Sequence, residues 1–355
     1  MSVGTLPNAP ESSWTRWAMN SYFLRFAYTY KDRYSATVTG RVDGSSKFGK
    51  NNKYAFFPSA GLAWNISQED FLKDNALISN LKLHTSYGLT GNSEIDPYNS
   101  LGKVDAGTYY IDAKRSAYSY IKTMSNPDLK WETTITRNIG LDFGFFNERL
   151  TGNIDYYWNT VKDLLIEQSI TAIGYKTMQQ NIGQTSNRGV ELTLNAAILQ
   201  KKDYSLNFNF NIGFNKNKVD KLANGISSMS YNSGAFSSDM RGRDDYRVIV
   251  GEPLGIVWGY VYDGVYGVDD FVTYTDENGK TQFQFDKSGN YILKEGVTDN
   301  TYTTASSYGG LRPGAMKLKD QDGDHKITEK GDRVIIGRTQ PKFTGGFGLS
   351  GNYKW

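Results

Sequence analysis

The chain has no cysteine, and among its 355 residues only 8 are proline and 2 are histidine. The absence of cysteine excludes a disulfide framework and any metal site built from thiolates. No stretch approaches the roughly 18 consecutive apolar residues that identify a membrane-spanning helix. The net charge of +3 is too small for this length to indicate a nucleic-acid partner. The sequence also lacks the GxSxG, HExxH and P-loop motifs, so no common catalytic signature is present.

What the chain has in abundance is strict alternation of apolar and polar residues, together with 25 tyrosines and 37 glycines. In the segment DYSLNFNFNIGFN, from Asp203 to Asn215, every second residue from Tyr204 to Phe214 is apolar and every residue between is polar or glycine. Successive side chains of a strand point to opposite faces, so one face is aromatic and the other hydrophilic. This pattern is typical of a strand between lipid and a watery lumen.

The same alternation recurs along most of the chain and predicts about nine strands, each of about the length that crosses a bilayer at a tilt. The predicted strands are Ser21 to Lys31, Tyr34 to Asp43, Phe56 to Ile66, Leu81 to Thr90, Thr133 to Phe143, Leu150 to Val161, Gly189 to Ala196, Tyr204 to Asn215 and Phe343 to Trp355. A spanning protein without membrane helices must be a barrel, because lipid cannot satisfy open backbone groups. The predicted fold class is therefore all-β, a transmembrane antiparallel β-barrel.

The lengths of the connections support this interpretation, since barrels of this kind have short periplasmic turns and long extracellular loops. Tight turns are expected at 31–33, 147–149 and 199–202, whereas 44–53, 91–130, 162–188 and 216–342 are long. The third connection, 67–80, is intermediate. We expect the long connections, above all 91–130 and 216–342, to lie outside the cell.

Several strings resemble those of SusC/RagA-type TonB-dependent outer-membrane transporters, in the order found in that family. They are YKDRY from Tyr30, GRVDGSSKFG from Gly40, FFPSAGLAWNIS from Phe56, LKLHTSYGLTGN from Leu81, NPDLKWETT from Asn126, NIGLDFGFFNERLTGNIDYY from Asn138, NRGVELTLN from Asn187, VGEPLGIVWGYVYDGVY from Val250 and DRVIIGRTQPKFTGGF from Asp332. The resemblance implies part of a barrel of about 22 strands. It also implies import of oligosaccharides or peptides across the bacterial outer membrane, with TonB energy and a SusD-like surface lipoprotein as partners.

Compared with that plan, the sequence predicts an internal piece of the barrel. We expect a lead-in over residues 1–20 and a partial barrel over 21–355, with no plug domain and no TonB box before the first strand. The start, MSVGTLPNAPESSW, shows no basic and apolar signal segment. The predicted strand count is odd, whereas bacterial single-chain barrels have even numbers of strands.

One motif suggests a metal site. In KDQDGDHKITEKGD, Lys319 to Asp332, the residues Asp320, Asp322 and Asp324 stand at positions 1, 3 and 5 of a calcium loop, and alternate carboxylates suit a hard cation. Position 6 is His325 instead of glycine, and position 12 is Gly331 instead of a bidentate carboxylate. Glu329 and Asp332 are the further candidate ligands. The alternative is a solvated turn rich in aspartate.

Other candidates for chemistry are few. His84 falls on the polar face between Lys82 and Ser86, and a catalytic role there would need a partner carboxylate from another strand. Aromatic residues near the first tight turn predict an interfacial girdle: Trp14, Trp17, Tyr22, Tyr28, Tyr30 and Tyr34. Aromatic residues of the long connections can stack on sugar rings or pack within the loops: Tyr109, Tyr110, Tyr118, Tyr120, Trp258, Tyr260 and Tyr262.

The sequence therefore favours a nutrient importer in contact with outer-membrane lipid, not an enzyme, with calcium as an optional cofactor. Two alternatives stay open at this point. An outer-membrane barrel enzyme of protease or lipase type should show a closed, even barrel and a carboxylate and histidine cluster at its outer rim. A soluble β adhesion module should bury its aromatic faces against each other.

Overall fold

The computed structural model describes residues 14–353 except 74, 112–113, 171–176, 224, 232–243 and 304–309. The chain divides into two compact units, residues 1–226 with 342–355, and residues 227–341. Part of the predicted lead-in, residues 1–13, and the last two residues of the predicted final strand lie outside the described residues. No helix in the described part of the chain is long and apolar enough to cross a membrane.

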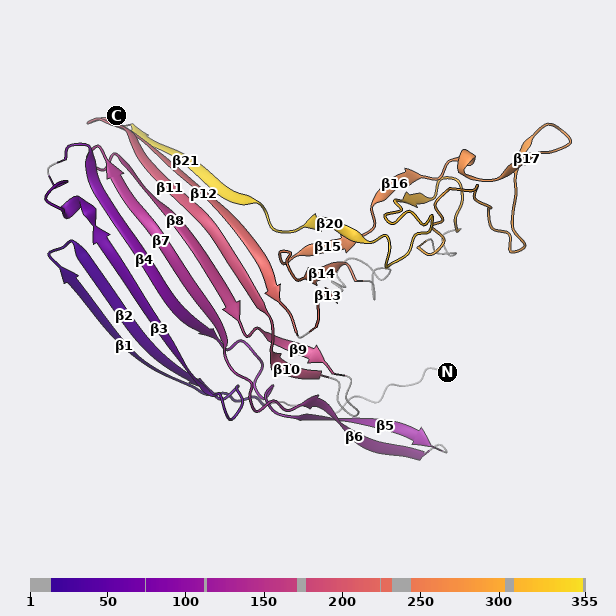
Figure 1. Ribbon diagram of the computed structural model, residues 1–355, viewed down its shortest axis with the longest axis horizontal. Coiled ribbons are helices and arrows are strands. Elements are labelled where there is room, and N and C mark those ends of the chain that lie inside the picture. The colour runs from indigo at the N-terminus through magenta and orange to yellow at the C-terminus, as the bar shows by residue number, and fades with distance from the viewer. Residues whose placement is uncertain are drawn as a thin grey trace. The chain divides into compact units, whose positions relative to one another are not determined.

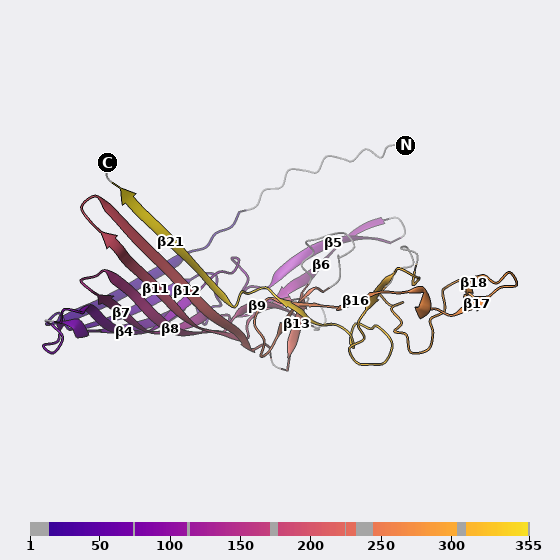
Figure 2. The same ribbon diagram turned by 90° about the horizontal axis from the view of Figure 1, so that it is seen from above.

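The first unit is built on one antiparallel sheet of nine strands, which confirms the predicted fold class (Figure 1). In sheet order the strands are β1 (Met19–Tyr30), β2 (Tyr34–Ser45), β3 (Tyr54–Asn65), β4 (Ile78–Asn92), β7 (Glu132–Phe145), β8 (Leu150–Lys162), β11 (Gln184–Gln200), β12 (Tyr204–Lys221) and β21 (Phe343–Tyr353). Each corresponds to one predicted strand. Figure 2 shows that the sheet is curved, with β12 and β21 turned away from the plane of β4, β7 and β8.

The register gives this sheet one apolar face across all nine strands. One row of directly opposed residues runs Tyr28, Ala36, Leu62, Thr85, Ile139, Tyr156, Val190, Phe214 and Phe343. Opposed residues point to the same side of a sheet, so these side chains form a continuous band. Leu62 and Phe343 are both 59% exposed, although leucine and phenylalanine are usually buried. We call this side the apolar face and the opposite side the polar face.

Several strands are longer than predicted, β11 and β12 most of all. The sequence pattern suggested a strand only from Gly189 to Ala196, but β11 begins at Gln184, and β12 continues past Asn215 to Lys221. The added residues still pair across the sheet, Ser186 with Lys218 for example. Alternation is needed only where one face meets hydrocarbon. Where the strands extend into polar surroundings, the backbone pairing continues although the apolar pattern has ended.

One end of the sheet, here called the turn end, carries the short connections. Lys31 and Asp32 have φ of 50° and 55°, which allows the two strands β1 and β2 to reverse within three residues. The intermediate connection after β3 contains η1 (Ile66–Gln68). Just after η1, the carboxylate of Glu69 accepts hydrogen bonds from Arg33 at 3.0 Å, Tyr34 at 2.6 Å and Trp64 at 2.9 Å. Glu69 thereby fastens this connection to the aromatic residues at the turn end.

The opposite end, here called the loop end, contains the buried core of the first unit. Phe48, Phe57, Ile95, Leu129 and Trp131 pack together there. The predicted loops contain strands of their own, in a sheet ordered β5 (Lys103–Ile111), β6 (Lys114–Met124), β10 (Thr177–Asn181) and β9 (Leu165–Ser169). Within the described ranges no second layer covers the nine-stranded sheet, so the buried core of this unit lies where the long connections fold over the end of the sheet.

The second unit, within the long connection after β12, is folded too. Its sheets are β13 (Ser228–Tyr231), β14 (Tyr246–Ile249), β15 (Ile256–Gly259) and β20 (Val334–Arg338), then β16 (Tyr262–Val265) with β19 (Met316–Leu318), and β17 (Thr273–Thr275) with β18 (Thr281–Phe283). A short turn of helix, η3 (Val268–Asp270), precedes β17. Tyr266 and Phe271 are almost fully buried at its centre. Burial raises the pKa of Tyr266 to about 12, and its hydroxyl donates to Thr298 O at 2.5 Å.

Candidate functional site

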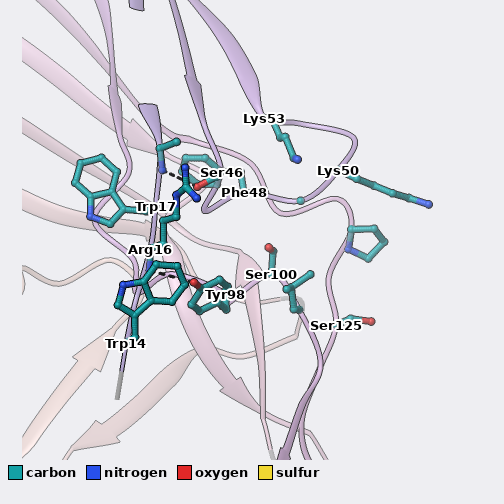
Figure 3. Close-up of a pocket in the computed structure, with 14 residues that line it drawn as sticks. Trp14, Arg16, Trp17, Ser46, Phe48, Lys50, Lys53, Tyr98, Ser100 and Ser125 are labelled. Carbon is teal, nitrogen blue, oxygen red and sulfur yellow. Dashed lines mark hydrogen bonds between the residues drawn. The ribbon is translucent and has the colours of Figure 1, made fainter. Parts of the chain in front are cut away.

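A pocket of about 900 Å³ lies at the loop end of the first unit (Figure 3). Its walls come from the segment before β1 and from the connections after β2 and β4 and before β7. Arg16 N donates to the hydroxyl of Tyr98 at 3.1 Å, and Ala18 N donates to Ser46 Oγ at 2.9 Å. These two bonds fix the first segment against the other walls. Phe48, which is 1% exposed, contributes to the lining.

The lining of this pocket combines aromatic rings with cations. Trp14 is 78% exposed and Trp17 is 55% exposed, and Lys50 and Lys53 lie on the other side of the pocket (Figure 3). Exposed indole rings stack on planar or apolar ligand surfaces, and lysine ammonium groups attract anionic groups. The volume lies within the range of ordinary small-molecule sites. The sequence pattern predicts a role only for the two tryptophans of this pocket, in a girdle near the first tight turn. That placement is wrong, because Trp14 and Trp17 precede β1 and lie at the loop end, whereas the tight turn follows β1 at the turn end. No local motif connects them to Lys50 and Lys53.

A second group of polar side chains lies on the polar face, at the middle of the sheet. His84 Nε2 lies 3.6 Å from Asp142 Oδ1 and 3.7 Å from Asp155 Oδ1, and Lys82 Nζ lies 3.4 Å from Asp142 Oδ2. Gly140 makes room for this group, because a Cβ there would lie 2.4 Å from His84 Cε1. The structure thus supplies the carboxylates that the sequence could not locate. Their separations from the imidazole are longer than hydrogen bonds.

In the second unit, the structure brings together three of the five predicted metal ligands. One carboxylate oxygen from each of Asp320, Asp322 and Asp324 lies within 4.8 Å of the others. His325, at the position where a calcium loop prefers glycine, has φ of 62°, so it takes the left-handed conformation itself. A Cβ on Gly331 would lie 2.2 Å from Asp322 Oδ2. The carboxylate of Asp322 therefore lies directly beside Gly331, which stands at position 12, where a calcium loop has a bidentate carboxylate.

The other two candidates have different partners. Asp332 is fully buried, and its carboxylate accepts the backbone N–H of Gln321 at 2.8 Å and of Thr328 at 2.6 Å. Glu329 forms an ion pair with Arg333 at 2.8 Å. Asp332 thus ties the two ends of the loop together, and the carboxylate of Glu329 is paired with Arg333. A cation in this loop would be held by Asp320, Asp322 and Asp324.

Hydrogen bonding and burial shift the pKa values of Asp320 and Asp322 in opposite directions. Burial acts to raise the pKa of Asp320, but bonds from the N–H groups of Gly323 and His325 outweigh it and lower the pKa. Burial raises the pKa of Asp322, and the charges of Asp324, Asp332 and Asp320 add to the increase. A bound cation would relieve this repulsion. The residues present therefore fit a hard divalent ion.

The aromatic residues proposed for sugar stacking pack largely against neighbours. The ring centroids of Tyr109 and Tyr118 are 5.8 Å apart, and those of Tyr118 and Tyr120 are 5.9 Å apart. Arg247 covers the ring of Trp258 at 4.5 Å, and Arg333 lies 5.9 Å from that of Tyr260. Packing within the connections therefore accounts for most of them.

Comparison with known proteins decides the family. The family model described as "TonB dependent receptor-like, beta-barrel" matches residues 3–318. The chain belongs to this family. "TonB-dependent receptor P3" of Formosa agariphila is 35% identical over 354 residues, which is 99% of this chain and 32% of that protein. "TonB-dependent receptor SusC" of Bacteroides thetaiotaomicron is 36% identical over 300 residues, 79% of this chain and 28% of SusC.

The solved structures agree with these sequence relatives. A chain of "Structure of the RagAB peptide transporter" superposes with a TM-score of 0.69 at 28% identity, covering 95% of this chain and 32% of that one. This TonB-dependent receptor chain thus spans about a third of the length of its relatives. The predicted SusC/RagA-type resemblance and the bacterial outer-membrane location are confirmed. Because the relatives are receptors and transporters, the alternatives of a barrel enzyme and of a soluble adhesion module are wrong.

Proposed function

We propose that this chain forms part of the wall of an outer-membrane importer that takes up oligosaccharides or peptides. The observation that carries the proposal is the nine-stranded sheet, with one face suited to lipid and the other lined by amide, hydroxyl and charged groups. Such a wall supports transport of polar cargo through a lumen. Membership of the TonB-dependent receptor family supports energy coupling through TonB.

The pocket at the loop end is the best candidate for contact with the cargo. Trp14 and Trp17 can stack on sugar rings or on aromatic side chains of a peptide, and Lys50 and Lys53 favour an anionic group on the same cargo. The RagAB structure is described as a peptide transporter, which supports peptides as one cargo class. The SusC/RagA-type resemblance of the sequence further implies a SusD-like surface lipoprotein as partner.

The test is uptake of fluorescent oligosaccharides and peptides by cells that make the complete transporter, with and without TonB. Uptake should saturate and should disappear when TonB is removed. The Trp17→Ala variant should raise the cargo concentration at half-maximal uptake by roughly threefold to tenfold. Lys201→Ala, at the turn end, is the matched control and should leave uptake unchanged. Saturable uptake that persists without TonB would contradict the proposal.

A further inference from the structure

The apolar face is free of charge except at one place. Among the described residues of the nine strands, side chains with charge on this face are confined to the loop end of four neighbouring strands. They are Arg137 on β7, Lys162 on β8, Arg188 on β11, and Lys216 and Lys218 on β12, followed by Asp220 and Lys221 at the bulged end of β12. We call Arg137, Arg188, Lys216 and Lys218 the basic patch.

The basic patch lies directly beyond the aromatic band of the same face. Arg188 is opposite Trp158 on one side and opposite Lys216 on the other. The next row toward the middle of the sheet contains Tyr156 and Phe214, and the rings of Tyr156 and Trp158 are 5.4 Å apart. Aromatic girdles mark the boundary between hydrocarbon and headgroups. The cations therefore stand at the depth of the lipid headgroups.

The positive charges of this patch are poorly compensated. Like charges directly opposite in a sheet destabilise it, as Arg188 and Lys216 do here. Lys218 Nζ lies 3.9 Å from Asp220, whereas no carboxylate lies within ion-pair distance of Arg137, Arg188 or Lys216 among the described residues. Arg137 instead lies over the ring of Tyr87 at 5.8 Å and contacts Thr160 Oγ1 at 3.4 Å.

The patch also borders a hollow that can hold a headgroup. This hollow has a volume of about 430 Å³, and its lining includes Trp158, Thr160, Ser186, Arg188, Lys216 and Lys218. Asp220, the ion-pair partner of Lys218, is the one carboxylate in the lining, so the three cations still outnumber it. The lining thus combines cationic side chains, two hydroxyls and the indole ring of Trp158. Guanidinium groups bind phosphate in bidentate geometry, and lysine adds a mobile point charge.

We propose that the basic patch binds the phosphate groups of a phosphorylated glycolipid of the outer leaflet, of the lipid A type. The acyl chains of such a lipid would lie along Tyr156, Phe214 and the apolar rows beyond them, while its phosphates neutralise Arg188 and Lys216. The position favours a lipid over a soluble anion, because the patch continues directly into the apolar band. This inference depends on the outer-membrane location and not on the proposed cargo.

The test uses the complete transporter that carries this chain, purified in mild detergent and titrated with lipid A, with retained lipid counted by native mass spectrometry. The double variant Arg188→Gln with Lys216→Gln should bind lipid A roughly tenfold or more weakly, as expected for the loss of two cations at a lipid surface. Lys201→Gln with Lys202→Gln removes two cations at the turn end and should bind like the parent protein. The charge-conserving Arg188→Lys with Lys216→Arg should retain most of the affinity.

Two further ligands separate a lipid site from a phosphate site. Dephosphorylated lipid A should bind all variants equally weakly, and inorganic phosphate at the same concentration should not displace lipid A. Equal lipid A binding by the parent protein and the double variant would overturn the proposal, as would full displacement by inorganic phosphate. If the double variant fails to assemble, the single variants Lys216→Gln and Lys218→Gln should each weaken lipid A binding severalfold. Unchanged lipid A binding by both single variants would also overturn the proposal.

Discussion

At Asp322, burial and three neighbouring carboxylates act in the same direction and raise the pKa of the side chain. A protonated Asp322 cannot serve as a cation ligand, and a bound cation would favour its ionised form. The arrangement therefore makes any cation affinity depend on pH. Affinity should be full near neutrality and should fall as the pH decreases through the raised pKa of Asp322, because protons then compete with the metal.

Calorimetry with calcium on the protein tests this loop. We expect binding in the range of weak extracellular sites, about 10⁻⁴ to 10⁻³ M. Asp322→Ala should abolish the heat, whereas Glu329→Gln, which changes a residue paired with Arg333, should leave it intact. Absence of any heat at millimolar calcium would leave only a structural turn fastened by Asp332.

The two faces of β12 predict opposite tolerance to charge. Phe208 lies on the apolar face between Ala196 and Leu349, whereas Asn207 lies on the polar face. A carboxylate facing hydrocarbon costs on the order of 1 to 3 kcal/mol, depending on depth. Phe208→Asp should therefore reduce the yield of folded barrel in outer membranes, measured by heat-modifiable electrophoretic mobility. The carboxylate introduced by Asn207→Asp would remain hydrated on the polar face, so this variant should assemble normally. Equal yields for the two variants would count against a lipid-facing Phe208.

At the scale of the strands, alternation located all nine members of the main sheet, because every one of them has one face to keep apolar. The pattern failed where that requirement ends. Gln184 to Asn187 and Lys216 to Lys221 pair as strand although neither face is apolar. The hairpin of β5 and β6 was hidden in a predicted loop, because only its hydrogen bonds and tyrosine packing define it.

The candidate sites likewise divide into those whose residues are close in sequence, which could be predicted, and those assembled by the fold, which could not. Asp320, Asp322 and Asp324 could be found because they are close in sequence and their spacing is a motif. The partners of His84 could not, since Asp142 and Asp155 come from β7 and β8 and depend on the register. The pocket at the loop end combines four separate segments, so no local sequence signal predicts it.

The connections predict a definite topology. We expect the turn end to face the periplasm and the loop end to face the medium. Single cysteines are clean probes because the chain has none. In whole cells, a membrane-impermeant maleimide should label Lys50→Cys and Asn278→Cys but not Glu148→Cys or Lys201→Cys. Equal labelling of all four positions would refute this orientation.

For the whole molecule, the sheet ends at β1 and β21, each of which pairs on one side only in the described structure. Unpaired backbone groups in hydrocarbon cost several kcal/mol each, so both edges require partner strands in the membrane. A protein made of these residues alone should therefore aggregate, be degraded or leak, and should give no energy-dependent uptake. Saturable, TonB-dependent uptake by cells that make only residues 1–355 would contradict this expectation.

That one face of this sheet meets lipid and the other meets water is tested most directly by spin labels placed one at a time from Ser205 to Phe214 on β12. In the complete transporter reconstituted in bilayers, labels at even positions such as 208 and 210 should collide mainly with oxygen dissolved in the lipid. Labels at odd positions such as 207 and 209 should collide mainly with a water-soluble nickel chelate. Accessibility that alternates with a period of two is the predicted result, and uniform accessibility along the strand would contradict a membrane wall.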